Sequence, residues 1–200
     1  MMISGKQLVF YLGIDPTGPD IHLGHTTNLF VLKKLWGLGH KIILLIGDFT
    51  ATIGDPTDKE AARRPLTEKE IKENMKTYLD QIHKILPKRS FETRYNSKWY
   101  KKMPVKEWLR ITSLFTQQQM VSRDMFQERI KKDRPISLQE FVYPVLQGYD
   151  SVVMDVDGEI GGNDQMFNML IGRDLLRKLK SREKIVIATK LLEDPATGKK

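Results

Sequence analysis

Residues 11–25 of this chain read Tyr-Leu-Gly-Ile-Asp-Pro-Thr-Gly-Pro-Asp-Ile-His-Leu-Gly-His. The apolar run over residues 8–14 predicts a strand, and the dense turn formers of residues 15–20 end it. Asp20 is expected to cap the helix that follows. A strand that leads through a tight turn into a helix is the beginning of a crossover unit, and the rest of the chain can be placed around it.

Two histidines open the predicted helix. His22 and His25 are three positions apart, so they share one face of the first turn beside free backbone N–H groups and the positive end of the helix dipole. Gly24 leaves the helix surface bare, so a nucleobase can approach the backbone closely. Histidine donates to phosphate oxygens whether neutral or charged. The helix start therefore predicts a phosphate site, although one histidine could equally cap the helix while the other packs.

The composition limits the class of protein. The 200 residues are 40% hydrophobic, enough to bury the core of one domain. A net charge of +8 favours a polyanionic partner, although lysine and arginine also solvate ordinary surfaces. The chain has no cysteine and four scattered histidines, so we expect no metal site. No run is long enough to span a bilayer and no signal-peptide core is visible, so we expect a cytoplasmic protein without a membrane partner.

Strand and helix patterns alternate along the chain. Apolar residues at helical spacing continue to Gly37, and a fully aliphatic run then covers residues 42–46. Such runs are buried on both faces in parallel sheets covered by helices. Shorter strands are predicted over residues 91–95, 151–156 and 185–188. The sequence therefore predicts an α/β fold with a doubly wound parallel sheet.

Helices are expected between these strands. Thr67 and Glu70 form a capping box at the start of a helix that runs to about residue 86. Residues 104–130 predict two helices with more apolar side chains than one internal stripe requires. We expect a helical insertion over about residues 104–134 that carries a contact face, with a second core layer as the alternative.

A loop after the second strand carries candidate ligands. Residues 47–59 are rich in glycine, hydroxyl and acidic side chains, and open α/β sheets bind ligands at the edge where strands end. Asp55 is a candidate for an ammonium group, and Lys59, Arg63 and Arg64 are candidates for phosphate. The alternative is a solvated connector with surface charges.

A later helix carries a polar face. Ser137 is expected to cap it, and Tyr143, Gln147 and Asp150 follow at intervals of four and three, so they share one side. A phenol, an amide and a carboxylate are rarely found together in a hydrophobic core. The face is either part of a binding site or a satisfied polar seam.

A glycine pair marks the next strand-to-helix junction. Gly161 and Gly162 precede a helix expected over residues 165–179, and glycines there let the backbone approach a ligand closely. Asp164 can accept two hydrogen bonds from a ribose diol. The junction is therefore a candidate nucleoside contact.

Taken together, these motifs resemble the bacterial-type tyrosyl-tRNA synthetases, class I enzymes that activate tyrosine with ATP and transfer it to tRNA. The resemblance covers nearly the whole chain. It rests on residues 11–25, 53–57, 143–150 and 161–165, which follow one another in the family's order. It implies a Rossmann-like catalytic domain of the HxGH class over residues 1–200, with tyrosine, ATP, Mg²⁺ and tRNA(Tyr) as ligands and a homodimer formed through the insertion.

The resemblance also implies roles for single residues. The positions similar to the catalytic groups are Thr17 and His22 at the γ-phosphate, His25 beside the ribose, and Lys59 and Arg63 on the pyrophosphate. Those similar to the tyrosine-binding groups are Tyr11 and Asp150 at the phenolic hydroxyl, Asp55, Tyr143 and Gln147 at the ammonium, and Gly13. Those similar to the ATP-binding groups are Asp15, Gly24, Gly162, Asp164 and Gln165. The attacking nucleophile is then the tyrosine's own carboxylate, so the protein acts by positioning and charge stabilisation.

The sequence also departs from the family pattern. Asp58 stands where the family commonly has glycine, and Leu12 is bulkier than the usual residue beside the nucleotide. The family's Lys-Met-Ser-Lys-Ser loop is expected to begin around Lys200, so that loop and the anticodon-binding domain fall outside the sequence, as in an isolated catalytic core.

Three other functions stay open from the sequence. One is a fragment that only binds tyrosine and ATP, or RNA. Another is a small-molecule adenylyltransferase, which shares the histidine helix start. The third is a tryptophan-activating relative, against which the pair of Tyr11 and Asp150 argues, because an indole N–H needs one acceptor and no second hydroxyl.

Overall fold

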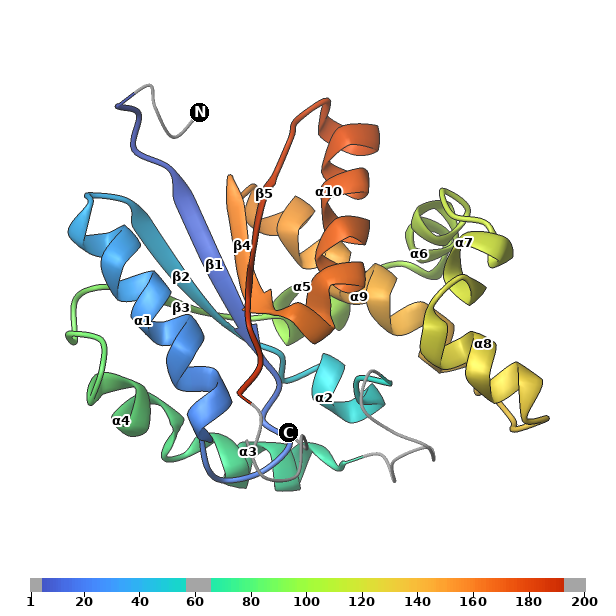
Figure 1. Cartoon of the computed structure of the whole chain (residues 1–200), viewed down its shortest axis with the longest axis horizontal. Helices are drawn as coiled ribbons and strands as arrows, with labels where there is room; N and C mark the ends of the chain where they lie inside the picture. The colour runs from blue at the N-terminus through green and yellow to red at the C-terminus, as the bar shows by residue number, and fades with distance from the viewer. Residues whose placement is uncertain (1–4, 57–65, 193–200) are drawn as a thin grey trace.

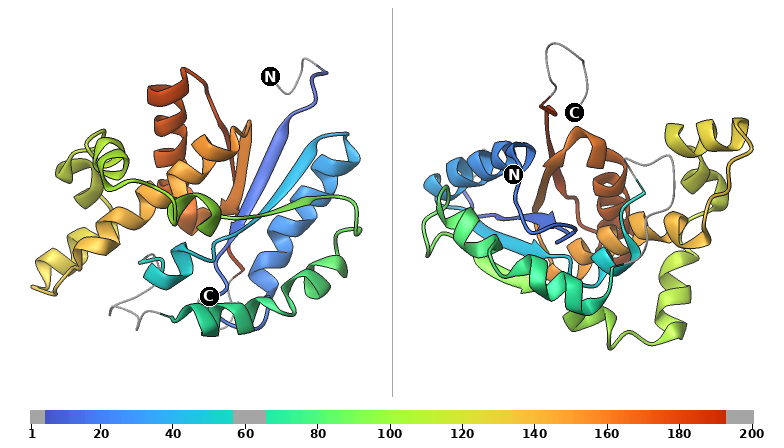
Figure 2. Two further views of the ribbon diagram at one scale, coloured as in Figure 1. Left: turned by 180° about the vertical axis from the view of Figure 1, so that it is seen from behind. Right: turned by 90° about the horizontal axis from the view of Figure 1, so that it is seen from below.

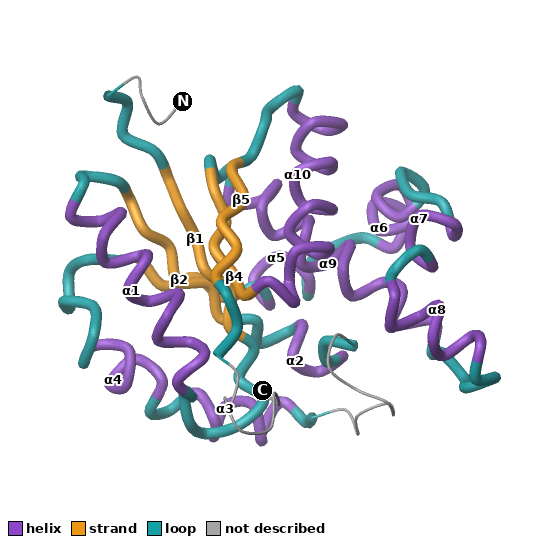
Figure 3. Tube along the Cα trace, viewed as in Figure 1, coloured by secondary structure: helices purple, strands orange, loops and turns teal. Residues whose placement is uncertain are grey.

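The computed structural model describes residues 5–56 and 66–192, and its centre is a five-stranded parallel sheet (Figures 1 and 3). The strands are β1 (Val9–Ile14), β2 (Lys41–Ile46), β3 (Glu92–Tyr95), β4 (Gly158–Gly162) and β5 (Ile185–Thr189). Their order across the sheet is β3-β2-β1-β4-β5, and each neighbouring pair is parallel. The predicted α/β fold with a parallel sheet is therefore confirmed.

The two faces of the sheet are buried by different helices. Phe10 and Leu12 of β1 pack in one core cluster with α1 (Leu23–Gly37) and α4 (Tyr78–His83). Tyr11 points to the opposite face, where it packs with Met154 of α9 (Leu138–Met154). Side chains of a strand alternate between faces, so the continuous apolar runs of β1 and β2 require helices on both sides.

The connections wind outward from the centre in both directions. Helix α1 links β1 to β2, and α10 (Met166–Lys180) links β4 to β5 on the other side of the sheet's midline (Figure 1). Right-handed crossovers that run in opposite directions place their helices on opposite faces. The order of strands therefore changes direction between β1 and β4, which is the position where doubly wound sheets form a ligand crevice.

The predicted strand over residues 151–156 is wrong. Residues 151–154 continue α9, whose C-cap Asp155 adopts a left-handed conformation with φ 54°, and the strand follows at Gly158–Gly162. A short apolar run cannot be assigned to strand or buried helix by periodicity alone. The true strand reads Gly-Glu-Ile-Gly-Gly, a composition that is depleted in strands.

Two predicted helix boundaries also differ. Asp20 does not cap α1, because the N-cap position is occupied by His22 with φ −86° and ψ 169°. The capping box of Thr67 and Glu70 is confirmed, but the helix it starts, α3 (Glu68–Met75), ends before α4 begins at Tyr78. The segment was therefore predicted correctly as helical and wrongly as one helix.

The segment for which two helices were predicted, residues 104–130, contains three. They are α6 (Val105–Thr112), α7 (Gln117–Val121) and α8 (Asp124–Lys131). A second capping box, in which Thr116 and Gln119 bond each other reciprocally, starts α7 and divides the segment. These helices project from the side of the sheet (Figures 1 and 2).

The short helices α2 (Thr50–Ile53) and α5 (Ser97–Tyr100) follow β2 and β3. No helix in the described residues is long and apolar enough to cross a membrane.

Helices α9 and α10 approach each other at two glycines. A Cβ on Gly148 would lie 2.8 Å from the backbone nitrogen of Gly172. Backbone atoms cannot rotate away, so we expect Gly148→Ala to lower the free energy of unfolding by about 1–3 kcal/mol. Urea unfolding measures this change. The matched control is Gly37→Ala, where no atom lies within 4 Å of the added methyl; an equal loss in both variants would contradict the close-packing argument.

Candidate active site

A cavity of about 880 Å³ opens where the strands end. Because all five strands are parallel, the residues that follow them meet at this edge, among them Asp15 after β1, Gly47 after β2 and Asn96 after β3. The predicted site residues that line it are Tyr11, Gly13, Asp15, Thr17, His22, Gly24, His25, Asp55, Tyr143, Gln147, Asp150, Gly162, Asp164 and Gln165. Lys59, Arg63 and Arg64 lie outside the described residues.

The floor of the cavity presents a buried carboxyl group. Asp150 is 2% exposed and accepts hydrogen bonds from Trp99 Nε1 at 2.9 Å and Asn96 Nδ2 at 3.3 Å. Burial raises the pKa of Asp150 to about 8, although these donors pull it down. Its charge also helps to raise the pKa of Tyr11, after burial and Glu159. A buried carboxyl group and a buried phenol are thus near neighbours.

A second buried carboxylate ties three elements together. Asp15 accepts from Thr50 Oγ1 at 2.7 Å and from Tyr143 Oη at 2.8 Å, so it joins the turn after β1 to α2 and α9. Burial raises the pKa of Asp15 to about 7 against these two hydrogen bonds. A Cβ on Gly47 would lie 1.8 Å from Asp15 Oδ1, so this carboxylate occupies space that only glycine leaves open. Both oxygens of the predicted ATP-binding residue are engaged by protein hydroxyls.

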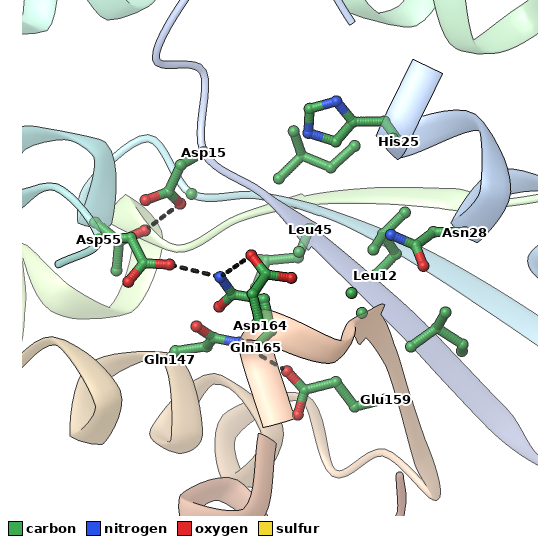
Figure 4. Close-up of a pocket in the computed structure, with 18 of the residues that line it drawn as sticks. Leu12, Asp15, His25, Asn28, Leu45, Asp55, Gln147, Glu159, Asp164 and Gln165 are labelled. Atoms are coloured by element: carbon green, nitrogen blue, oxygen red, sulfur yellow. Dashed lines mark hydrogen bonds between the residues drawn. The ribbon is translucent and has the colours of Figure 1, made fainter. Parts of the chain in front are cut away.

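A network of amides connects the remaining polar residues, and Figure 4 shows the part of it that involves Gln165. Gln165 Nε2 donates to Asp55 Oδ2 at 2.7 Å and to Asp164 Oδ2 at 3.3 Å. Asn168 donates to both Gln165 and Gln147 at 2.9 Å. These bonds fix the orientation of the amides, so the side chains of Asp55 and Gln147 are held to one wall.

The histidines lie at the start of α1 as predicted. The ring centroids of His22 and His25 are 3.9 Å apart, and a Cβ on Gly24 would lie 3.0 Å from the His22 ring. Burial, followed by the neighbouring His22, lowers the pKa of His25 to about 4, so its imidazole is neutral near pH 7. His25 Nδ1 is buried and has no hydrogen-bond partner among the described residues. A neutral imidazole with an unused nitrogen is suited to a hydrogen bond with a ligand.

Several functional candidates were missed from the sequence. Asn96 follows β3 directly, so the rule that ligands bind at strand ends could have found it. Trp99 donates to Asp150 from α5, a helix that was not predicted from the sequence, and Asn168 donates to Gln147 from α10. Glu159 and Lys184 are 25 positions apart and meet only because β4 and β5 are neighbours.

The family model of tRNA synthetases class I (W and Y) matches residues 4–200. The chain belongs to this family. A tyrosine–tRNA ligase of Francisella tularensis is 49% identical over 188 residues, which cover 94% of this chain and 48% of the relative. One from Carboxydothermus hydrogenoformans is 47% identical over 190 residues, covering 95% and 46%.

The synthetase fold is also found in a solved structure. The C-terminally truncated mitochondrial tyrosyl-tRNA synthetase of Coccidioides posadasii aligns with a TM-score of 0.79 and 26% identity, covering 98% of this chain and 61% of that one. This chain spans about half the length of the curated relatives it matches. It corresponds to the part of a class I synthetase that contains the Rossmann-like sheet.

We expect Asp150 to make the ligand-free synthetase chain less stable as pH rises. Its carboxyl ionises near 3.8 in the unfolded chain and near 8 in the folded one, so between these values only the unfolded state has released the proton. The contribution of the protonated Asp150 to the free energy of unfolding is therefore fully present below pH 3.8 and lost by about pH 8. Urea unfolding from pH 5 to 8 should show a shallower decline for Asp150→Asn than for the wild type. Asp80→Asn, on an exposed position of α4, should keep the wild-type slope; a wild-type slope in Asp150→Asn would refute the assignment.

Proposed function

We propose that this chain is the catalytic core of a tyrosine–tRNA ligase. In this function tyrosine and ATP form tyrosyl-adenylate and pyrophosphate, and the tyrosyl group is then transferred to tRNA(Tyr). One observation carries the proposal: a single cavity holds a buried phenol and carboxylate at its floor, an amide network on its wall and the histidine pair at a helix start. Both curated relatives described above are named for tyrosine, which gives no support to a tryptophan-activating function.

Tyrosine fits the floor and wall of the cavity. Asp150 accepts the phenolic hydrogen and Tyr11 contacts the phenolic oxygen. A ligand without that hydroxyl would leave one hydrogen-bonding position unfilled on each of these buried groups, which costs free energy. The ammonium group then lies among Asp55, Tyr143 and Gln147, beside Gly13. A small-molecule adenylyltransferase would not require this cluster, so its ordered hydrogen bonds favour amino-acid activation.

ATP fits the edge nearest the start of α1. Thr17 and His22 donate to the γ-phosphate, and the neutral His25 donates near the ribose, beside Gly24. Asp164 accepts from the ribose hydroxyls next to Gly162. Because the tyrosine carboxylate itself attacks the α-phosphate, the protein's contribution is to hold the two substrates in line and to stabilise the charge of the leaving pyrophosphate. Lys59 and Arg63 would supply cations for that charge.

Mg²⁺ enters this proposal bound to ATP. No group of three or more His, Cys, Asp or Glu side chains in the described ranges is placed to hold a metal ion. Mg²⁺ commonly keeps several waters and binds through triphosphate oxygens rather than through a dedicated protein cage, so the nucleotide would bring the ion into the site. The net charge of +8 suits tRNA as the second substrate. A cytoplasmic location stays a prediction.

The exchange of labelled pyrophosphate into ATP tests the activation step. We expect tyrosine to support exchange and phenylalanine and tryptophan to fail. His22→Ala and Asp150→Ala should each lower the rate roughly 100-fold, because each removes a hydrogen-bonding group from the transition state or from the substrate that it positions. Asp80→Ala on the exposed side of α4 is the control and should retain the rate.

Two other results would be informative. If no amino acid supports exchange while calorimetry still detects tyrosine binding, the chain is a binding fragment that lacks part of the catalytic machinery. If calorimetry detects neither tyrosine nor ATP, the proposed function is wrong.

We also propose that the chain forms a homodimer through its projecting helices. Large apolar side chains are exposed there, including Leu109 of α6 at 60% and Leu138 at the start of α9 at 80%. Exposed apolar groups on a projecting element are typical of protein interfaces. Sedimentation at high concentration should give twice the mass of the 23.2 kDa chain, and Leu109→Asp with Leu138→Asp should give the monomer. A monomer at every concentration of the unaltered chain would refute this interface.

A further inference from the structure

A fully buried lysine lies behind the floor of the cavity. The Lys184 side chain is 0% exposed, and its ammonium forms an ion pair with Glu159 and donates to Ser151 Oγ at 2.8 Å. Glu159 Oε1 accepts from Gln147 Nε2 at 3.2 Å. Glu159 lines the cavity, whereas Lys184 and Ser151 do not. Lys184 therefore contacts groups beneath both ends of the proposed tyrosine site without reaching the ligand.

The packing of two helices leaves room for this ammonium. A Cβ on Gly172 of α10 would lie 2.4 Å from Lys184 Nζ and 3.0 Å from Ser151 Oγ. Gly172 is also the residue against which Gly148 of α9 packs. The space between these helices is thus filled by a charged group rather than by an apolar side chain.

Stability alone does not account for a buried ion pair of this kind. Removing two charges from water costs free energy that their attraction only partly returns, and apolar side chains of the same volume often stabilise a core equally well. What an ammonium supplies and an apolar group does not is hydrogen-bond direction, because it donates and never accepts.

Lys184 determines which partner donates in the hydrogen bond between Ser151 and Tyr11. Ser151 Oγ must accept from the ammonium, so its own hydrogen is available to another acceptor. Tyr11 Oη lies 2.9 Å from Ser151 Oγ. When Ser151 donates to Tyr11, the hydrogen of the Tyr11 hydroxyl is free to point into the cavity.

Lys184 also restrains a competing acceptor. Burial, followed by the charge of Glu159, raises the pKa of Tyr11, so Glu159 is close enough to compete for the Tyr11 hydrogen. An unpaired Glu159 carboxylate would attract the Tyr11 hydrogen away from the ligand. The ammonium of Lys184 neutralises that carboxylate.

We propose that Lys184 is a positioning residue for substrate selection, which acts through Ser151 to direct the Tyr11 O–H toward the phenolic oxygen of tyrosine. Tyr11 then donates a hydrogen bond to the phenolic oxygen of tyrosine, and Asp150 accepts one from the phenolic hydrogen. One hydroxyl of the substrate is thus recognised by a donor and by an acceptor. This inference rests on the proposed function and adds to it the origin of the hydrogen-bond polarity at the floor.

Two variants interrupt the relay while keeping the fold. Ser151→Ala removes the link and leaves the ion pair in place. Lys184→Met with Glu159→Gln removes both charges at similar volume and keeps an oxygen for Gln147. The control is Arg182→Met with Asp157→Asn, a second ion pair, at 2.7 Å, that joins the same two segments away from the cavity. Circular dichroism and thermal unfolding establish that each variant is folded.

The measurement is the affinity for tyrosine by calorimetry and for phenylalanine by its displacement of tyrosine. We expect both relay variants to weaken tyrosine binding roughly 10-fold while phenylalanine binding is unchanged, so the preference for tyrosine falls by that factor. The control pair should keep the wild-type preference. A general structural defect would weaken both ligands together.

A double-mutant cycle with Tyr11→Phe then tests whether the effect passes through Tyr11. In that background Ser151→Ala should cause no further loss, because the relay ends at the missing hydroxyl. Losses that add, or relay variants that keep the wild-type preference, would overturn the inference. If the unaltered chain binds no tyrosine, it is the proposed function that fails, so the two outcomes are distinct.

Discussion

The parallel pairing of all five strands is the constraint on which the site depends. Parallel strands bring their carboxyl ends to one edge, so the residues that leave β1, β2, β3 and β4 meet although they are far apart in sequence. Asp15, Asn96 and Asp164 reach one cavity for this reason. Because the crossovers leave β1 and β4 in opposite directions, α1 and α10 diverge and the crevice between those two strands stays open. A change of strand order would scatter the same side chains.

Burial is the second constraint, because it disfavours the charged form of the acidic groups that the parallel strands gather at one edge. Gathering carboxylates at a dry sheet edge raises the pKa of Asp15 to about 7 and of Asp150 to about 8. Each of these groups accepts two hydrogen bonds from the protein, which offset part of the desolvation cost. What remains of that cost makes the site selective, because a ligand that completes the hydrogen bonds of a buried carboxyl group is favoured over one that leaves a position on it unfilled.

The sequence predicted what local chemistry determines and failed where tertiary contacts decide. The turn over residues 15–20 and the capping box at Thr67 use signals within a few residues, and both elements were found. The strand Gly158–Gly162 was missed because its glycines indicate a loop, and they fit there only because neighbouring side chains pack against bare backbone; a Cβ on Gly158 would lie 2.3 Å from the Phe10 ring. The pairing of Glu159 with Lys184 depends on strand order, which no local pattern contains.

The polar groups behind the cavity form one continuous chain of contacts. It runs through Tyr11, Ser151, Lys184, Glu159, Gln147, Asn168, Gln165 and Asp55. The groups proposed for the phenol and for the ammonium of one substrate therefore belong to the same hydrogen-bonded unit. Hydrogen bonds within such a unit polarise one another, so the loss of one member changes the strength of its neighbours' bonds. The close approach of Gly148 and Gly172 brings the two helices together around that chain, which makes backbone packing between α9 and α10 a condition for side-chain order in the site.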